Sequence, residues 1–349
     1  MKCTDNLFLK YVNSISVRAA VLSAAALLFV SGCGTKTYEL EHAYDVYGTS
    51  IHYDASPADA DASGQAADSA DSADSKEISY FASKLCVASK KQKGTKAFKA
   101  EAAEAAGVFH LSDGTVTYSK NIYKKLYPAS TTKILTAYIA LKYGKLTDVV
   151  TVSEQAATQA GDSSVCGLHT GDRLTLEELL YGLLLKSGND AADAIAEHIS
   201  GDPESFARLM NEEAALLGAT HSHFTNPHGL QDENHYTCVY DLYLMFNAAL
   251  EYEEFQTIIK ASNHTASYTD VNGTQVTQDW ETTDRYLNGT AQPPEGVEVV
   301  GGKTGTTSDA GNCLALYSIN AMQEPVISIV LKADSSDNLY SVMSELLVR

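Results

Sequence analysis

Ser130 and Lys133 stand three residues apart at the start of an apolar run, PASTTKILTAYIAL. Residues at this spacing share one face of a helix, so the hydroxyl and the amine are expected to point the same way. A buried lysine is costly unless its charge is paired or lost, and a neutral amine can take the proton from a serine nucleophile. A capping serine followed by a lysine that extends to solvent would give the same pattern. The pair alone therefore leaves the function open.

Two further polar triplets follow, Ser187-Gly188-Asn189 and Lys303-Thr304-Gly305. The first falls in a break between two expected helices, and the second ends an expected strand. In this order the three motifs match the S-x-x-K, S-x-N and K-T-G set of serine acyltransferases that react with penicillin. Each triplet alone is a weak signal, and Lys-Thr-Gly occurs often by chance, but the ordered set on these three kinds of element predicts an acyl-transfer site.

The residue types suit a reaction that passes through an acyl-enzyme. Ser130 is the expected nucleophile and Lys133 its base, because burial and the charge of Lys303 both lower the pKa of a lysine amine. Ser187 can pass the proton to the leaving amine, and Asn189 can hold the substrate amide. These residues are thus predicted to converge from three distant parts of the chain.

The strand that ends in Lys-Thr-Gly is expected to hold the end of the substrate. Lys303 offers a positive charge for a terminal carboxylate, and the hydroxyls of Thr304 and Thr306 can donate hydrogen bonds to it. The backbone N–H groups of Ser130 and Thr306 are the expected oxyanion hole. Three glycines are expected to let the substrate backbone approach this strand closely: Gly301, Gly302 and Gly305.

The elements around the motifs predict an α/β fold of the α+β type. Asp113-Gly114 between two apolar runs predicts a hairpin, and the helix after Ser130 is expected to stop at Gly144. A capping box at Thr175 and the pair Asp202 and Pro203 predict two helix starts. Strands are expected over 297–305, 311–320 and 325–333, followed by a helix over 338–348. This order predicts one antiparallel sheet flanked by helices, with an inserted helical subdomain.

From about Ala105 to its end, the sequence resembles the serine-type D-alanyl-D-alanine carboxypeptidases, the low-molecular-mass penicillin-binding proteins. Four stretches carry the resemblance: PASTTKILTA, LLYGLLLKSGNDAADAIAEHISG, FTNPHGL and GGKTGTTSDAGNCL. It implies a DD-peptidase catalytic domain over 101–349 with a β-lactamase/DD-peptidase-like fold and no cofactor. It also implies removal of the terminal D-Ala from peptidoglycan pentapeptide stems, and acylation by β-lactams. FTNPHGL is expected to form a site wall near Ser187, and we expect a monomer.

The N-terminal part predicts export rather than a fold. Basic residues precede a short apolar run over 19–30, which is typical of a secretory signal. VSGC, ending at Cys33, resembles the lipobox of bacterial lipoproteins, although a plain signal with an incidental cysteine gives the same letters. We therefore predict a signal peptide over 1–32, a lipid on Cys33, and an acidic, disordered tether and lead-in over 33–100. The protein is then expected on the outer face of the bacterial cell membrane.

The anchor is a departure from the family pattern. Family members often continue into a second β-rich domain and a C-terminal amphipathic membrane helix, whereas 44 residues follow Gly305 here. The lipid on Cys33 is expected to replace that helix. The net charge of −19 argues against a nucleic-acid partner. Four further cysteines lack CxxC spacing and are expected to be free, mostly buried thiols: Cys86, Cys166, Cys238 and Cys313.

Other functions remain to be weighed against this one. A class A β-lactamase needs a deacylating glutamate in a Glu-x-x-Leu-Asn loop. The nearest match begins at Asp284, 19 residues before Lys303, and is interpreted as a loop that packs near the site. DD-endopeptidase activity on cross-links would use the same chemistry and stays open. A non-catalytic peptidoglycan-binding lipoprotein is disfavoured by the intact motifs.

A metal site is a further alternative, because histidines and acids cluster in HSHFTNPHGLQDENH. Zinc needs ligands that converge in space, and the spacing here is irregular. FTNPHGL also has a place in the serine-peptidase pattern. We therefore predict no metal at this cluster, which comprises His221, His223, His228, Asp232, Glu233 and His235.

Overall fold

The computed structural model describes residues 85–88 and 100–349. The predicted signal peptide, Cys33 and most of the predicted tether lie outside the described residues. The chain divides into two units at Ser75 and Lys76, and all described residues belong to the second unit. Within the described part, no helix is both long and apolar enough to cross a membrane.

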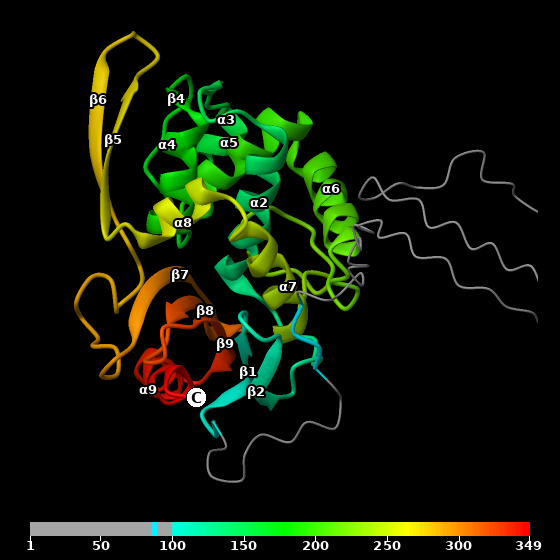
Figure 1. The fold of residues 1–349 in the computed structure, drawn as a ribbon. Helices are drawn as coiled ribbons and strands as arrows, with labels where there is room; N and C mark the ends of the chain where they lie inside the picture. Colours follow the sequence, from blue (N-terminus) through cyan, green and yellow to red (C-terminus); the bar gives the residue numbers. More distant parts are fainter. Residues whose placement is uncertain (1–84, 89–99) are drawn as a thin grey trace, which may run out of the picture. The chain divides into compact units, whose positions relative to one another are not determined.

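A five-stranded antiparallel sheet joins the two ends of this unit (Figure 1). The hairpin predicted at Asp113-Gly114 is present, with Gly114 at φ +70° in the turn. β1 then pairs with the last strand, so the sheet has the order β2-β1-β9-β8-β7. The predicted strands are confirmed with these bounds: β1 Ala103–His110, β2 Thr115–Lys120, β7 Glu298–Thr307, β8 Gly311–Ile319 and β9 Pro325–Ala333.

Both faces of this sheet are buried, in two separate apolar cores. Successive strand residues alternate between the cores, because side chains on a strand point to opposite faces. Val108 lies in the core under α9 (Ser336–Leu347), while its neighbour Phe109 lies in the larger core under the helical part. α7 (Val239–Ala249) contacts β1 and β9 on that second face. The sheet is therefore a central layer between helices.

The predicted helical subdomain lies between β2 and β7 in the sequence. At two starts, the capping side chain accepts a backbone N–H as predicted: Thr175 from Glu178, and Asp202 from Ser205. α2 ends before Gly144, also as predicted. Besides α7, the α-helices of this part are α2 Lys133–Tyr143, α3 Glu154–Ala157, α4 Leu176–Tyr181, α5 Asn189–Ser200, α6 Pro203–Leu216 and α8 Glu253–Lys260.

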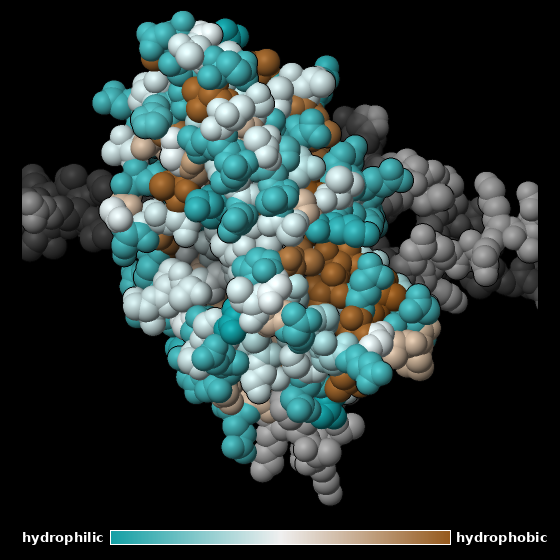
Figure 2. All heavy atoms as spheres, turned by 90° about the vertical axis from the view of Figure 1, so that its left-hand side faces the viewer, coloured by the Kyte–Doolittle hydropathy of each residue, from teal (hydrophilic) through white to brown (hydrophobic). Residues whose placement is uncertain are grey.

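A second antiparallel sheet of four strands corrects the prediction of a single sheet. Its order is β3-β4-β5-β6. β3 (Val149–Thr151) and β4 (Arg173–Thr175) have three residues each, too few to show a period. β5 (Asn263–Thr269) and β6 (Gln275–Glu281) are mostly polar and exposed, so no apolar run marks them. Figure 2 shows the face of the molecule on the β5–β6 side, which is mainly hydrophilic, with small apolar spots and a larger apolar patch at the lower right.

The four cysteines among the described residues are free and buried, as predicted. Each lies below 5% exposure, so the core rather than a disulfide holds the fold.

Candidate active site

The serine and lysine of the first motif meet at the start of α2. Ser130 lies in a single 3₁₀ turn, Ala129–Thr132, that leads directly into α2 at Lys133. Lys133 is fully buried, with its Nζ 3.1 Å from Ser130 Oγ. The same nitrogen lies 2.7 Å from Asn189 Oδ1 and 2.9 Å from the carbonyl oxygen of His228. A neutral amine has two N–H donors for these two acceptors, which leaves its lone pair for the serine hydroxyl.

The surroundings of Lys133 favour that neutral form. Burial lowers the pKa of its amine well below the ordinary value, and the positive charge of Lys303 lowers it further. The carboxylates of Asp193 and Asp190 act in the opposite direction with smaller effect. The predicted base therefore lies where a serine proton can be accepted.

Ser187 occupies an unusual backbone conformation. The last turn before it, Gly182–Lys186, is a π-helix, and Ser187 itself has φ +62° in the left-handed region. Such distortions are frequent at functional sites. They place Ser187 Oγ 2.9 Å from Lys303 Nζ. A side chain at Gly188 would lie 2.3 Å from the sulfur of Cys166, so this turn requires glycine.

β7 brings the third motif against the nucleophile turn. Lys303 is 1% exposed, and its Nζ also lies 2.9 Å from the carbonyl oxygen of Thr304. Burial lowers the pKa of Lys303 to about 7, while Asp284 acts to raise it. A Cβ on Gly305 would lie 2.8 Å from Ser130 N, so β7 passes directly beside this backbone N–H. Thr306 follows Gly305 on the same strand.

Like Gly305, the other two β7 glycines lie against backbone atoms of the fold. A Cβ on Gly301 would lie 1.9 Å from the carbonyl oxygen of Ile259, and Gly301 has φ +149°. A Cβ on Gly302 would lie 1.9 Å from the carbonyl oxygen of Ala315. These close approaches are inside the fold, so packing by itself requires glycine at both positions.

A polar cleft of about 240 Å³ opens over these motifs. Ser130, Ser187 and the β7 edge line it, whereas Lys133, Asn189 and Lys303 are buried behind that lining. The structure thus brings all predicted site residues within the described chain into one place. The lining consists of Ser130, Ser164, Ser187, Thr283, Arg285, Thr304, Gly305, Thr306, Asn312, Cys313, Ser336, Leu339 and Tyr340.

The FTNPHGL loop supports the floor of the site. The carbonyl oxygen of His228 accepts from Lys133, and that of Pro227 accepts from the hydroxyl of Thr136 on α2. Gly229 has φ +91°, and a Cβ there would lie 1.9 Å from the carbonyl oxygen of Ala129. The loop thus contacts the Ser130 turn and α2, and it also contacts α5 through His228 and Asp193 and α6 through Phe224 and Asn211.

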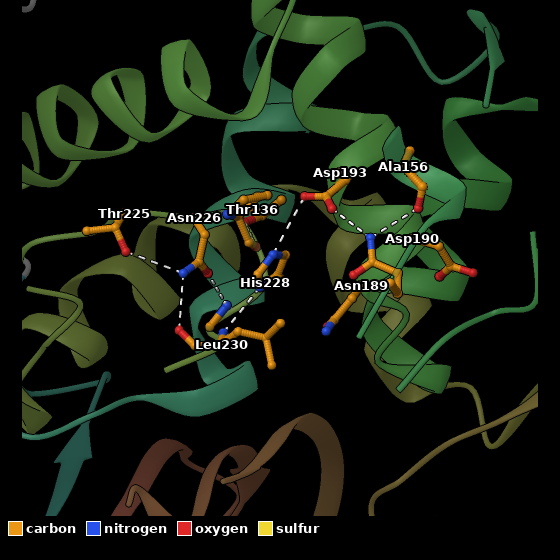
Figure 3. A network of polar contacts seen from close by, with 12 residues as sticks. Thr136, Ala156, Asn189, Asp190, Asp193, Thr225, Asn226, His228 and Leu230 are labelled. Carbon is orange, nitrogen blue, oxygen red and sulfur yellow. Dashed lines mark hydrogen bonds and ion pairs between the residues drawn. The ribbon is translucent and has the colours of Figure 1, made fainter. Parts of the chain in front are cut away.

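Two buried carboxylates near Lys133 escaped the sequence analysis. Asp190 accepts backbone N–H groups from Cys166, Gly167, Leu168 and Ala191, and so holds the loop that carries Ser164. Asp193 accepts from Gln159 at 2.7 Å and lies 3.7 Å from His228 Nε2 (Figure 3). Burial raises the pKa of Asp193 to about 6. Helical spacing gives a signal that could have found it, because Asn189 and Asp193 are four residues apart on α5.

The loop at Asp284 packs near the site, as predicted. Its neighbours Thr283 and Arg285 line the cleft, while Asp284 is 2% exposed and accepts the N–H of Tyr286. Burial raises the pKa of this carboxyl to about 6. Asp284 itself is not part of the cleft lining, so it is poorly placed to activate a water there.

The clustered histidines have separate partners. His223 Nδ1 contacts the carbonyl oxygen of Asn234, His228 faces Asp193, and His235 Nε2 lies 2.9 Å from Thr132 Oγ1. Burial lowers the pKa of His228 to about 3 and that of His235 to about 4, so both are neutral. His221 faces Asp241 on α7 instead.

Curated proteins of known name are similar to this chain in sequence. DacF of Bacillus subtilis, a D-alanyl-D-alanine carboxypeptidase, is 42% identical over 159 residues, covering 44% of this chain and 40% of the relative. The D-alanyl-D-alanine carboxypeptidase of Streptomyces sp. K15 is 31% identical over 244 residues, covering 66% of this chain and 81% of the relative. The chain spans about half the length or less of the first curated relatives it matches.

Solved structures agree with these matches. The crystal structure of the Streptomyces K15 DD-transpeptidase aligns with a TM-score of 0.66 and 28% identity, covering 73% of this chain and 97% of that one. A D-alanyl-D-alanine carboxypeptidase from Mycobacterium tuberculosis aligns with a TM-score of 0.62 and 28% identity, covering 70% and 89%. Residues 91–335 match the Peptidase S11 family, described as D-alanyl-D-alanine carboxypeptidase. On this match, and with the three motifs gathered in one cleft, the chain belongs to the D-alanyl-D-alanine carboxypeptidase family of serine peptidases.

Proposed function

We propose that this chain is a serine DD-carboxypeptidase that removes the terminal D-Ala from peptidoglycan pentapeptide stems. One observation carries the proposal. The buried Lys133 amine has two carbonyl-type acceptors at 2.7 and 2.9 Å and the Ser130 hydroxyl at 3.1 Å. This arrangement suits a neutral lysine that takes the proton of a serine nucleophile.

In the first step, Ser130 Oγ attacks the carbonyl carbon between the last two residues of the stem, and its proton passes to Lys133. The carbonyl oxygen gains negative charge as the tetrahedral intermediate forms. The backbone N–H groups of Ser130 and Thr306 are assigned to stabilise it. The contact of Gly305 with Ser130 N supports this assignment, because it keeps β7 beside the nucleophile.

In the second half of acylation, the peptide bond breaks and D-Ala leaves as an amine that needs a proton. Ser187 is assigned to pass on the proton that Lys133 took from Ser130, which leaves Lys133 neutral again; the Ser187 Oγ is hydrogen-bonded to Lys303 in the same cleft. Lys303 supplies positive charge for the terminal carboxylate, and Thr304 and Thr306 line the space where it would bind. Asn189 uses Oδ1 for Lys133, which leaves its NH₂ group for the substrate amide.

Water then attacks the ester of the acyl-enzyme and gives a proton to Lys133, which again acts as base. The shortened stem peptide is released, and the proton returns to Ser130. The same intermediate can pass to an amine, and a related structure is named a DD-transpeptidase. Endopeptidase cleavage of cross-links needs no additional catalytic group. We place carboxypeptidase activity first because the chain matches the family of that description.

The test is to incubate the purified whole chain with benzylpenicillin and to measure its intact mass over time, which detects acylation. A long-lived adduct on the wild type and none on Ser130→Ala is expected, together with D-Ala release from a stem pentapeptide. Rapid drug loss without a lasting adduct would instead indicate a β-lactamase. No adduct and no drug loss would refute serine acyl transfer.

We also propose that the protein is an exported lipoprotein and a monomer, held at the outer face of the membrane through Cys33. The VSGC sequence after the apolar run supports this. Incorporation of labelled palmitate that is lost in Cys33→Ala would support the lipid anchor. Unchanged labelling in that variant would refute it.

A further inference from the structure

Three side chains of metal-ligating type converge at the start of α7, outside the cleft lining. They are His221, Cys238 and Asp241, and one potential ligand atom from each lies within 4.8 Å of the other two. Among the residues that the structure describes, no other group of three or more histidine, cysteine or acidic side chains brings its ligand atoms this close together. We propose that it binds a zinc-type divalent cation.

The spacing of the ligand atoms suits a tetrahedral ion after a small adjustment. Bonds of about 2.0–2.3 Å in tetrahedral geometry place neighbouring ligand atoms about 3.3–3.8 Å apart. His221 Nδ1 and Asp241 Oδ1 are already 3.6 Å apart. The sulfur of Cys238 completes the triangle within the 4.8 Å limit. A rotation of the half-exposed His221 ring changes the distances from its nitrogen to the other two ligand atoms, and the Cys238–Asp241 distance depends on small shifts of those two side chains.

A buried oxygen without a hydrogen bond points into this group. Asp241 is fully buried, and its Oδ2 accepts from the backbone N–H of His221 and the hydroxyl of Ser222, both at 2.7 Å. Its Oδ1 has no hydrogen-bond partner. Leaving a buried carboxylate oxygen unsatisfied is costly, and the nearest basic nitrogen, His221 Nδ1, is beyond hydrogen-bond reach. A cation bound at this position would satisfy Oδ1.

The ligand types select the class of ion. A thiolate and an imidazole favour zinc over magnesium or calcium, which prefer oxygen ligands. One thiolate, one carboxylate and one neutral imidazole balance a divalent charge, which matters because Cys238 and Asp241 are both fully buried. The side chain of His221 is 42% exposed. The ion therefore has a path from solvent, and a water can occupy the fourth position.

The position of the group predicts a structural effect. It links residues 221–222 to the start of α7, and Thr237 at that start bridges to Leu126, four residues before Ser130. An ion there would join the 221–222 segment to the start of α7, next to the bridge that reaches Leu126. We expect it to stabilise the folded state, because it binds a site absent from the unfolded chain.

The test uses the untagged whole chain, stripped with a chelator and titrated with ZnCl₂ by calorimetry. One equivalent is expected to bind, and to bind at least about tenfold more weakly in His221→Asn and Cys238→Ser. His223→Asn is the matched control, because this histidine is two residues away and contacts the Asn234 carbonyl instead. It is expected to bind like the wild type.

Two further readouts identify the ligands and separate binding from misfolding. Cobalt titration should give a sulfur-to-cobalt charge-transfer band that is absent in Cys238→Ser. Zinc should raise the Tm of the wild type and of His223→Asn, but not of His221→Asn, a variant at a half-exposed position that is expected to fold. The proposal is overturned if the wild type binds no zinc, or if both ligand variants bind it like the wild type.

Discussion

Two lysines are buried in the same cleft but in contrasting surroundings. Lys133 contacts two carbonyl-type oxygens and a serine hydroxyl, and burial together with Lys303 lowers its pKa well below the ordinary value. Lys303 is equally buried, yet Asp284 counteracts the effect of burial and its pKa is about 7. The surroundings of Lys133 thus favour its neutral form, whereas Lys303 can still carry charge near neutral pH.

The contrast teaches that burial alone does not assign a role to a lysine. Each has a buried carboxyl group nearby, Asp193 for Lys133 and Asp284 for Lys303, and burial raises the pKa of both to about 6. Lys133 also experiences the charge of Lys303, which lowers its pKa further. The roles therefore follow from the whole set of neighbouring charges.

The largest expected effect is from removal of the base. Lys133→Met should lower the rate of acylation by benzylpenicillin roughly 10³-fold, since a general base contributes about 10²–10⁴-fold. Lys303→Met should mainly weaken binding of ligands with a carboxylate. Stopped-flow acylation over a range of drug concentrations separates the two effects. Equal loss of the limiting acylation rate in both variants would remove the distinction drawn here.

The next largest effect is expected from a substitution that pushes β7 away from the nucleophile. Gly305→Ala places a Cβ 2.8 Å from Ser130 N and 2.9 Å from Thr131 N. We expect about a 10²-fold slower acylation, because a displaced oxyanion donor costs about 10²–10³-fold. Gly161→Ala is the control, since nothing lies within 4 Å of its Cβ. Wild-type acylation rates in Gly305→Ala would contradict the assigned oxyanion hole.

The two carboxyl groups should act on opposite limbs of the pH profile. Asp284→Asn removes a charge that raises the pKa of Lys303. The alkaline limb, where Lys303 loses its proton, should therefore move to lower pH. Asp193→Asn removes a charge that raises the pKa of Lys133, so the acid limb should move to lower pH. Profiles of acylation rate from pH 4 to 10 check this, with changes of about tenfold on the limbs. Movement of the same limb in both variants would speak against separate roles.

The smallest effect concerns stability. The pKa of Asp193 is raised to about 6 in the fold, so the folded state binds this proton more tightly than the unfolded chain. The wild type should therefore lose stability as the pH rises through 6, and Asp193→Asn should lose about 1 kcal/mol less. Urea unfolding at pH 4.5 and 7.5 measures this, with Asp162→Asn as an exposed control. An identical pH dependence in Asp193→Asn and the wild type would contradict it.

Local patterns were sufficient for much of this protein. The hairpin at Asp113-Gly114, the caps at Thr175 and Asp202, and the helix end at Gly144 depend on residues a few positions apart, and all are present. The three motifs were also predictable, since their residue types and order specify a reaction. Strands β3 to β6 were not, because short or mostly polar strands carry little periodic signal.

From the sequence alone we could thus predict the candidate site residues and most of the elements that carry them. Only the tertiary structure decided their protonation and support: the His228 carbonyl on Lys133, Asp284 opposite Lys303, and the oxygen of Asp241 left without a donor. The physical reason is that desolvation and charge act through space. A pKa depends on groups that are brought together from distant parts of the chain, and sequence spacing does not contain those distances.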